Sequence, residues 1–212
     1  MSGSPPEFDG AFRETLGQLL AWRRDVRRFR DVALPAGALD RLLAVASGAP
    51  SVGLSQPWRF VTVDDPGRRL AIRANFVRAN AAALAMQDRA RGVAYARLKL
   101  AGLDEAPCHL AVCADMDPAQ GGGLGRATQP ETAAYSAVLA IHTLWLAARA
   151  EGIGMGWVSI LDPVAALETL DVPPGWCLVA YLCLGWPVED SEVPELERYG
   201  WERRRPPAVL KR

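Results

Sequence analysis

An uncharged segment in the second half of the chain constrains the fold more than any other feature. Residues 132–148 include no Asp, Glu, Lys or Arg and are rich in Ala and Leu. Pro130 before the segment, and Arg149 and Gly152 after it, are typical of helix ends. The segment has only 17 residues and includes Tyr, Ser, His and Thr, so it is a poor candidate for a membrane span. It therefore predicts a buried helix over Thr132–Ala150.

The apolar surface of this helix also predicts assembly. A helix that is apolar on nearly every side needs cover on every side. A chain of 212 residues cannot readily supply all of that cover from its own elements. We therefore expect a homodimer whose interface includes this helix.

The rest of the pattern predicts one α+β domain over residues 1–212, with a core from about residue 12 to 190 and an extended C-terminal tail over 191–212. The nearly continuous apolar run Cys177–Leu184 predicts a central strand buried on both faces. The other expected strands are Arg59–Val63, His109–Ala114 and Gly156–Ile160. The expected helices are Phe12–Arg23, Gly37–Ser47, Arg68–Arg91, Ala94–Leu103 and Pro163–Leu170.

Charge and composition exclude some partners. Lys plus Arg and Asp plus Glu each number 24, so net charge favours neither nucleic acid nor an anionic membrane. Arginines nevertheless gather in two clusters, over residues 23–30 and 203–205. Two basic patches in a neutral chain suit a small phosphorylated ligand, with a solvated charged face as the alternative.

Several smaller features favour ordinary structural roles. The four cysteines match neither a zinc site nor a redox pair, which favours buried reduced thiols in a cytoplasmic protein. No leader segment is expected from residues 1–9. His109 and His142 are expected to be neutral core histidines rather than metal ligands. The glycine-rich stretch 121–126 favours a flexible connection over a phosphate loop, since no Gly-Lys-Ser/Thr follows.

Two short segments are the strongest candidates for a binding site. Residues 50–58 read Pro-Ser-Val-Gly-Leu-Ser-Gln-Pro-Trp, and these turn formers let backbone amides approach a flat ligand closely. Residues 23–27 read Arg-Arg-Asp-Val-Arg, and guanidinium groups suit forked binding of phosphate and carbonyl-rich rings. The acidic Asp25 inside this basic stretch is unexpected and draws attention to its chemistry.

The chain resembles the flavin-dependent nitroreductase family from about residue 12 to 206, and more closely the branch that forms 5,6-dimethylbenzimidazole. The resemblance is carried, in order, by Arg23–Arg27, Ala49–Gly53, Gln56–Trp58 and Gly152–Ile160, with further matches at Arg78–Asn80, Leu98–Leu100, Leu144–Gly152 and Gly200-Trp201. It implies a nitroreductase-like fold with a central mixed sheet flanked by helices. It also implies an intertwined homodimer with FMN at the interface.

The resemblance implies a specific reaction. In this branch reduced FMN is a substrate, dioxygen is the co-substrate, no metal takes part, and the products are 5,6-dimethylbenzimidazole, the lower ligand of vitamin B12, and erythrose 4-phosphate. An FMN reductase is a candidate partner that would supply reduced flavin. Two alternatives stay open: an NAD(P)H-dependent FMN nitroreductase and a non-catalytic flavin-binding protein.

The resemblance also assigns residues. Asp25 and Ser159 fall on the positions that the branch uses for chemistry, Asp25 as a base and Ser159 as a hydrogen-bond partner near the ring edge. A carboxylate suits the proton transfers of flavin cleavage, and an ion pair that orients Arg24 or Arg27 is the alternative for Asp25. A lid is expected over residues 76–100. The expected flavin-binding residues are Arg23, Arg24, Asp25, Val26, Arg27, Pro50, Ser51, Gly53, Val158, Ser159, Ile160 and Arg204, of which Arg23, Arg27 and Arg204 hold the phosphate and ribityl oxygens.

Overall fold

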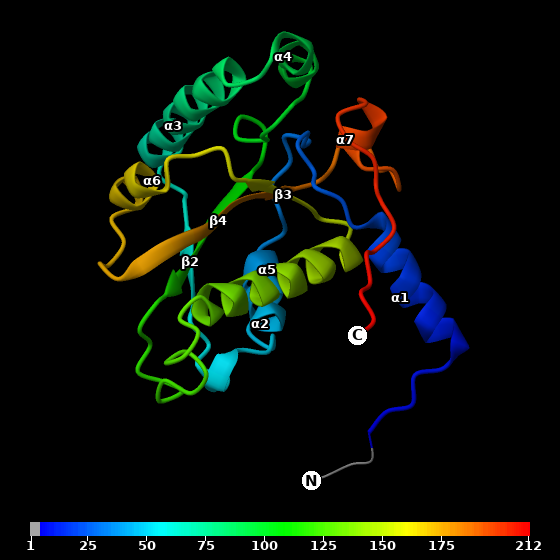
Figure 1. Cartoon of the computed structure of the whole chain (residues 1–212), viewed down its shortest axis with the longest axis vertical. Coiled ribbons are helices and arrows are strands. Elements are labelled where there is room, and N and C mark those ends of the chain that lie inside the picture. The colour runs from blue at the N-terminus through cyan, green and yellow to red at the C-terminus, as the bar shows by residue number, and fades with distance from the viewer. Residues whose placement is uncertain (1–4) are drawn as a thin grey trace.

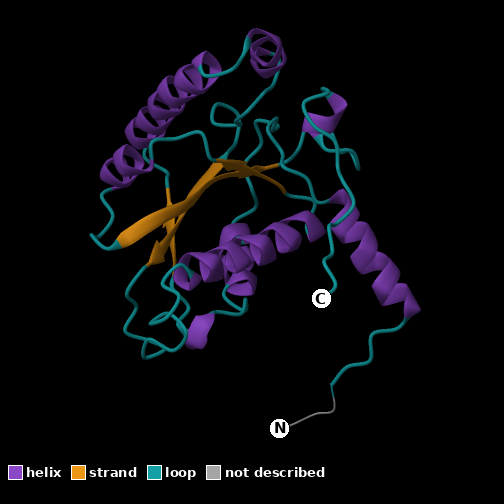
Figure 2. Ribbon diagram, viewed as in Figure 1, coloured by secondary structure: helices purple, strands orange, loops and turns teal. Residues whose placement is uncertain are grey.

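A four-stranded sheet lies at the centre of the molecule, with helices on both faces (Figures 1 and 2). The computed structural model describes residues 5–212. The expectation of no leader was drawn from residues 1–9, of which residues 1–4 lie outside the described residues. The strands are β1 (Trp58–Thr62), β2 (Cys108–Asp115), β3 (Gly154–Val158) and β4 (Trp176–Gly185), in the order β1-β2-β4-β3. The predicted α+β fold class is confirmed.

All pairings between these strands are antiparallel. The mixed character expected of the sheet comes from one isolated parallel bridge, between Asp25 and Met155. This bridge brings the Arg-Asp-Val segment to the outer edge of β3. β4 lies between β2 and β3, as its apolar sequence predicts. Its buried residues alternate between two cores: Leu182 faces one and Tyr181 the other.

Different helices cover the two faces of the sheet. On one face, α2 (Ala38–Ala46) and α5 (Thr132–Ala150) pack through Leu42, Ile141 and Leu144. On the other face lie α3 (Pro66–Ala85) and α6 (Pro163–Leu170), with Ile72 and Ala166 in the core. Both α3 and α6 begin at a proline preceded by an aspartate whose carboxylate caps the helix, a common start signal.

The helix α5 has the predicted bounds, but one chain does not cover it fully. Its inner side is buried, including Ala137, Ile141 and Leu144. Its outer side exposes Tyr135, Val138, Leu139 and His142. The prediction of a core histidine is therefore wrong for His142 within a single chain, because this residue lies on the uncovered side.

The helix α1 (Gly10–Trp22) has no buried residue. Its apolar side chains Phe12, Leu16 and Leu20 are exposed. Asp9 caps its first turn by accepting a hydrogen bond from the Phe12 amide at 2.8 Å. In Figure 1 the helix extends away from the sheet, with the N-terminal segment beyond it. No helix among residues 5–212 is both long enough and apolar enough to span a bilayer.

The region after α3 differs from the prediction. Two long helices were expected over 68–91 and 94–103, whereas α3 ends at Ala85 and a short α4 covers Arg89–Ala96. The break has a local cause, because the Asp88 carboxylate accepts a hydrogen bond from the Arg91 amide and starts a new helix. Residues after Arg97 form a loop, in which Lys99 pairs with Glu105.

Two smaller boundaries also differ. The strand expected over 156–160 is observed two residues earlier as β3, so that Ser159 and Ile160 follow the strand instead of ending it. The tail expected to be extended includes a short helix, α7 (Glu195–Arg198), whose Glu195 side chain pairs with Arg28. This ion pair fixes a segment that sequence propensity alone leaves undefined.

Candidate functional site

The Arg-Asp-Val segment and the glycine-rich β3 strand pack directly against each other. The Val26 amide donates to the Met155 carbonyl at 3.0 Å. A Cβ atom on Gly156 would lie 2.1 Å from the Val26 carbonyl oxygen, and one on Gly154 would lie 2.9 Å from the Val26 side chain. The two motifs are therefore complementary, since glycine in β3 is what lets the segment lie this close.

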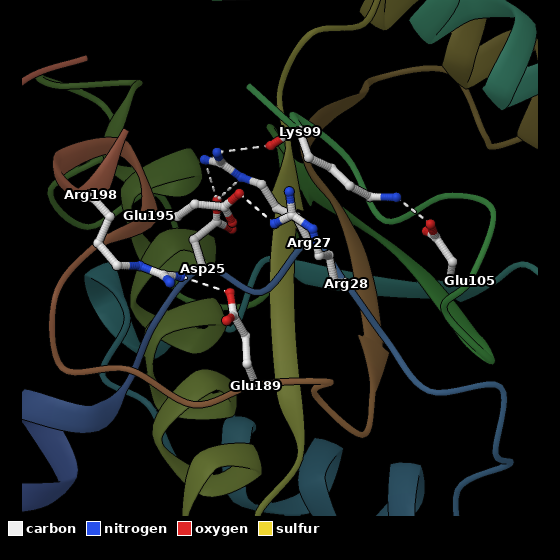
Figure 3. Close-up of polar contacts among 8 residues, drawn as sticks. All are labelled: Asp25, Arg27, Arg28, Lys99, Glu105, Glu189, Glu195 and Arg198. Atoms are coloured by element: carbon white, nitrogen blue, oxygen red, sulfur yellow. Dashed lines mark hydrogen bonds and ion pairs between the residues drawn. The ribbon is translucent and has the colours of Figure 1, made fainter. Parts of the chain in front are cut away.

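Asp25 lies at the centre of a polar network (Figure 3). Its Oδ1 accepts a hydrogen bond from the Trp157 amide at 2.8 Å. Its Oδ2 accepts from Arg27 Nε at 2.8 Å and lies 2.7 Å from Arg27 Nη2. An ionised carboxylate offers about four acceptor positions, so three donors leave room for one more. The side chain is 29% exposed, and a ligand can reach it.

Arg27 connects this carboxylate to the loop at Lys99, inside the predicted lid. Its Nη1 donates to the Lys99 carbonyl at 3.1 Å, in the loop that follows α4. Its side chain is 12% exposed. The sequence offered an ion pair with Arg27 as the alternative role of Asp25, and this ion pair is present. Arg27 also contacts Lys99, which lies in the predicted lid.

The predicted phosphate residues line one cavity of about 190 Å³. Arg23, Arg24, Arg27 and Arg204 contribute to its wall, together with Asp25 and residues 194–196 of the tail. Asp25 is paired with Arg27, and Glu195 with Arg28. Among residues 5–212, Arg23 and Arg204 form no ion pair with a carboxylate. The cavity therefore has excess positive charge suited to a phosphate.

The arginine pKa values reflect this crowding. Burial is the main cause that lowers the pKa of Arg23, with the charge of Arg204 adding to it and Asp25 opposing it. Burial also lowers the pKa of Arg24, and Arg204 and Arg23 lower it further. Arg23 stacks over the ring of Trp145, with 4.7 Å from the guanidinium carbon to the ring centroid. An added anion would relieve this repulsion.

A second cavity of about 150 Å³ adjoins the first and shares Arg27 and Leu196 with it. Ser159 and Ile160 line this cavity from the end of β3, and Tyr95, Leu98 and Leu100 line it from the predicted lid. Trp157 and Trp201 supply aromatic walls. A mostly apolar cavity beside a cationic one fits a ligand with a flat ring and a phosphorylated tail, as FMN has.

The loop at 50–53 is not at this site within one chain. The Val52 amide, in the 3₁₀ turn η1 (Val52–Leu54), donates to Ser136 Oγ at 3.1 Å. The arginine segment meets the same helix at Trp145, whose Nε1 donates to the Arg24 carbonyl at 3.1 Å. These contacts are nine residues apart on α5, or about 14 Å along its axis. Pro50, Ser51 and Gly53 therefore lie near one end of α5, and the arginines near the other.

Two of the predicted binding residues face the core. Val158 is 3% exposed, and Val26 packs with it in the cluster between the sheet, α3 and α6. The side chain of Val158 is therefore not available to a ligand, whereas Val26 is only partly buried. Sequence reasoning missed Tyr95, Trp157, Leu196 and Trp201 as lining residues. Three of them lay within features that the sequence had singled out: Trp157 in the Gly152–Ile160 match, Tyr95 in the predicted lid and Trp201 in the Gly200-Trp201 match.

The other candidate sites have structural explanations. Cβ atoms on Gly53 and Gly121 would lie 2.9 Å from the Leu124 carbonyl and 2.8 Å from the Gly53 carbonyl, so the glycine-rich stretch packs beneath η1. His109 is 1% exposed, and its Nδ1 is 2.9 Å from the Tyr181 hydroxyl. All four cysteines are free, and burial raises the pKa of Cys108 to about 11. Within the described residues no cluster of His, Cys, Asp and Glu could hold a metal ion.

The structure is thus that of an α+β protein in which a cationic cavity and a mostly apolar cavity share Arg27 and Leu196. The sequence model of the nitroreductase family matches residues 20–186. The chain therefore belongs to the nitroreductase family.

Full-length relatives narrow this classification. A 5,6-dimethylbenzimidazole synthase of Rhodospirillum rubrum is 59% identical, with 98% of each chain covered. One of Rhodobacter capsulatus is 49% identical, covering 94% of this chain and 96% of the relative. The chain is thus an enzyme of this family, closely similar to proteins named for that synthase activity.

A solved structure agrees with this classification. Iodotyrosine deiodinase bound to FMN and 3-iodo-L-tyrosine is 25% identical, with a TM-score of 0.73, covering 92% of this chain and 97% of that one. The sequence-based resemblance to the nitroreductase family and its synthase branch is confirmed.

Proposed function

We propose that this enzyme converts reduced FMN and dioxygen to 5,6-dimethylbenzimidazole and erythrose 4-phosphate, with no metal, and releases the pyrimidine part of the flavin ring as a separate fragment. The observation that supports this most directly is the carboxylate of Asp25 in the wall of the cationic cavity, paired with Arg27, which lines both the cationic and the apolar cavity. The full-length relatives named as synthases favour the same reaction. Reduced FMN would supply the carbon atoms of the product and the electrons that reduce dioxygen.

The residues divide into binding and chemistry. Arg23 and Arg204 would hold the phosphate, since both lie in the cationic cavity without a carboxylate partner among the described residues. Arg27 would orient Asp25 and close the site on the side of Lys99. Asp25 would take a proton at its remaining acceptor position, while Ser159 would bond to the ring edge from the apolar cavity. The lid would exclude water, which otherwise releases peroxide.

The proposal includes a homodimer in which Pro50, Ser51 and Gly53 complete the site of the partner subunit. Within one chain this loop is bound to α5 far from the arginine segment. The uncovered outer side of α5 and the apolar surface of α1 offer area for such a contact. An FMN reductase would provide reduced flavin, and cytoplasmic localisation would suit both the reduced thiols and this supply.

The test is aerobic incubation with reduced FMN, followed by chromatography for 5,6-dimethylbenzimidazole. Asp25→Asn should still bind reduced FMN but lose about 10²–10⁴-fold in rate of product formation. Asp115→Asn is the matched control, because Asp115 also pairs with an arginine, Arg59, at 2.8 Å but lies outside both cavities.

Other results would point elsewhere. Near wild-type product from Asp25→Asn would make this carboxylate structural. Loss of flavin binding would make it a binding element. Retained flavin that oxidises NAD(P)H with a nitroaromatic, without product, would favour the nitroreductase alternative. Bound flavin with neither activity would favour a flavin-binding protein.

A further inference from the structure

The aromatic ring of Trp201 contacts the lid from the C-terminal tail. Its centroid is 5.9 Å from that of Tyr95, in an edge-on arrangement at 66°. The guanidinium carbon of Arg91 lies 5.0 Å from the centroid of the Trp201 ring. Both partners are on α4, inside the predicted lid. The tail is thus packed against α4, whose Tyr95 lines the apolar cavity.

Tyr95 carries this contact into the body of the lid. Its side chain is 8% exposed, and its hydroxyl donates to the Asn80 Oδ1 at 2.7 Å. Asn80 belongs to α3, so one aromatic residue joins both lid helices. A contact on Tyr95 therefore affects the position of α3 and α4 together.

The tail residues that precede Trp201 are bound to the arginine segment. The tail carbonyl of Glu192 accepts from Arg24 Nε at 2.8 Å. In α7, Glu195 pairs with Arg28 and Arg198 with Glu189 (Figure 3). The Trp201 amide donates to the Leu196 carbonyl at 2.8 Å and so continues this fixed segment. Figure 1 shows α7 beside α4 at the same end of the molecule.

Trp201 also lines the cavity that contains Ser159 and Arg27. We propose that Trp201 is a positioning residue, a latch that joins the tail to α4 and holds the lid over the apolar cavity. Its effect on product formation rests on the proposed function. The latch itself is a property of the protein without ligand.

The lid provides a built-in probe of its own opening, because it includes the trypsin sites Arg89, Arg91, Arg97 and Lys99. Cleavage within a folded segment follows how often that segment opens. In the full chain without flavin, Trp201→Ala should speed cleavage in this segment by about tenfold, the scale expected from one aromatic pair and one cation–π contact. Trp201→Phe, which keeps an aromatic ring, should lie between.

The matched control is Trp176→Ala. Trp176 also has an arginine over its ring, with Arg59 at 5.7 Å, but it lies at the start of β4 and outside the apolar cavity. Cleavage of the lid should not change in this variant. If Trp201→Ala fails to fold, Arg91→Gln with hydrogen exchange measured over residues 86–100 tests the same contact. Unchanged lid cleavage, or unchanged exchange in that case, overturns the latch.

A second measurement connects the latch to the reaction. With reduced FMN and oxygen, Trp201→Ala should release more hydrogen peroxide and less 5,6-dimethylbenzimidazole for each flavin oxidised than the wild-type protein does. An opened lid with an unchanged product ratio overturns its role in the reaction. If the wild-type protein forms no 5,6-dimethylbenzimidazole, the proposed function fails, and the cleavage result alone decides the latch.

Discussion

At the scale of single residues, Asp25 is held on both carboxylate oxygens yet stays within reach of a ligand. The Trp157 amide binds one oxygen, and Arg27 binds the other with two nitrogens. Such fixed donors orient a carboxylate before a substrate arrives, which reduces the cost of ordering it during a reaction. Arg27 also donates to the Lys99 carbonyl, so this orientation is coupled to the loop of the predicted lid.

His109 offers a stability test at the same scale. Burial, with Arg69 adding to it, lowers the pKa of His109 from 6.5 to about 4, while Asp64 and Asp104 oppose this. The unfolded chain therefore binds one more proton than the folded chain between these values. The free energy of unfolding should fall as the pH is lowered through this window, by about 3 kcal/mol in all.

The measurement is urea unfolding at several pH values from 7 to 4. His109→Gln has no group that titrates here, so its free energy of unfolding should fall less steeply between about pH 6.5 and 4. Carboxylates also titrate in this window, but they contribute equally to both proteins. Equal pH slopes in the two proteins would contradict this, because they would mean that the folded state protonates His109 as readily as the unfolded chain does.

At the scale of elements, the contact between β3 and the Arg-Asp-Val segment positions the site. A strand with glycine at 154 and 156 is weak by itself, because glycine has no side chain to pack and loses much entropy. Here the missing side chains create the space in which Val26 lies. Close packing of the segment therefore requires glycine at positions 154 and 156, although glycine is unfavourable in a strand.

Gly156→Ala should displace this segment, because its Cβ would meet the Val26 carbonyl oxygen at 2.1 Å. We expect a loss of about 1–3 kcal/mol or more in unfolding free energy, and weaker binding of reduced FMN measured by anaerobic titration. Gly92→Ala is the control, since its Cβ would have only an ordinary contact, 3.9 Å from Gln87. A Gly156→Ala protein with wild-type stability and affinity would contradict this packing role.

At the scale of the whole molecule, one chain leaves apolar surface on two helices. Leu16 and Leu20 of α1 are 39% and 45% exposed, and Leu139 of α5 is 45% exposed. Large exposed apolar patches are typical of interfaces. The separation of the 50–53 loop from the arginine segment gives the same indication, because a second subunit could supply the missing part of each site.

We predict a dimer of about twice 22.9 kDa by sedimentation equilibrium. Leu139→Glu should shift it to the monomer, since a charge buried in an apolar contact lacks a partner. Loss of the partner's loop should also weaken flavin binding. Val164→Glu on α6, 63% exposed in the chain, is the control and should stay dimeric. A folded, active wild-type monomer would contradict both the dimer and the shared site.

Sequence alone determined the features that depend on local pattern. The uncharged segment gave the bounds of α5, the apolar run gave the buried central strand β4, and the ordered motifs identified the family. The first two signals each lie within one continuous stretch of the chain, and the motifs are short stretches in a fixed order. The arginine segment over residues 23–27 is also one continuous stretch, and it stays a predicted binding site.

Only the tertiary structure decided how these stretches meet. It placed α7 in the tail, where Glu195 pairs with Arg28, and brought Arg204 to the cavity of Arg23. It also separated the loop at 50–53 from that cavity and placed Trp201 against Tyr95, 106 residues away in sequence. The physical reason is that such contacts depend on packing and charge between distant segments, whereas propensity and periodicity report only on neighbours along the chain.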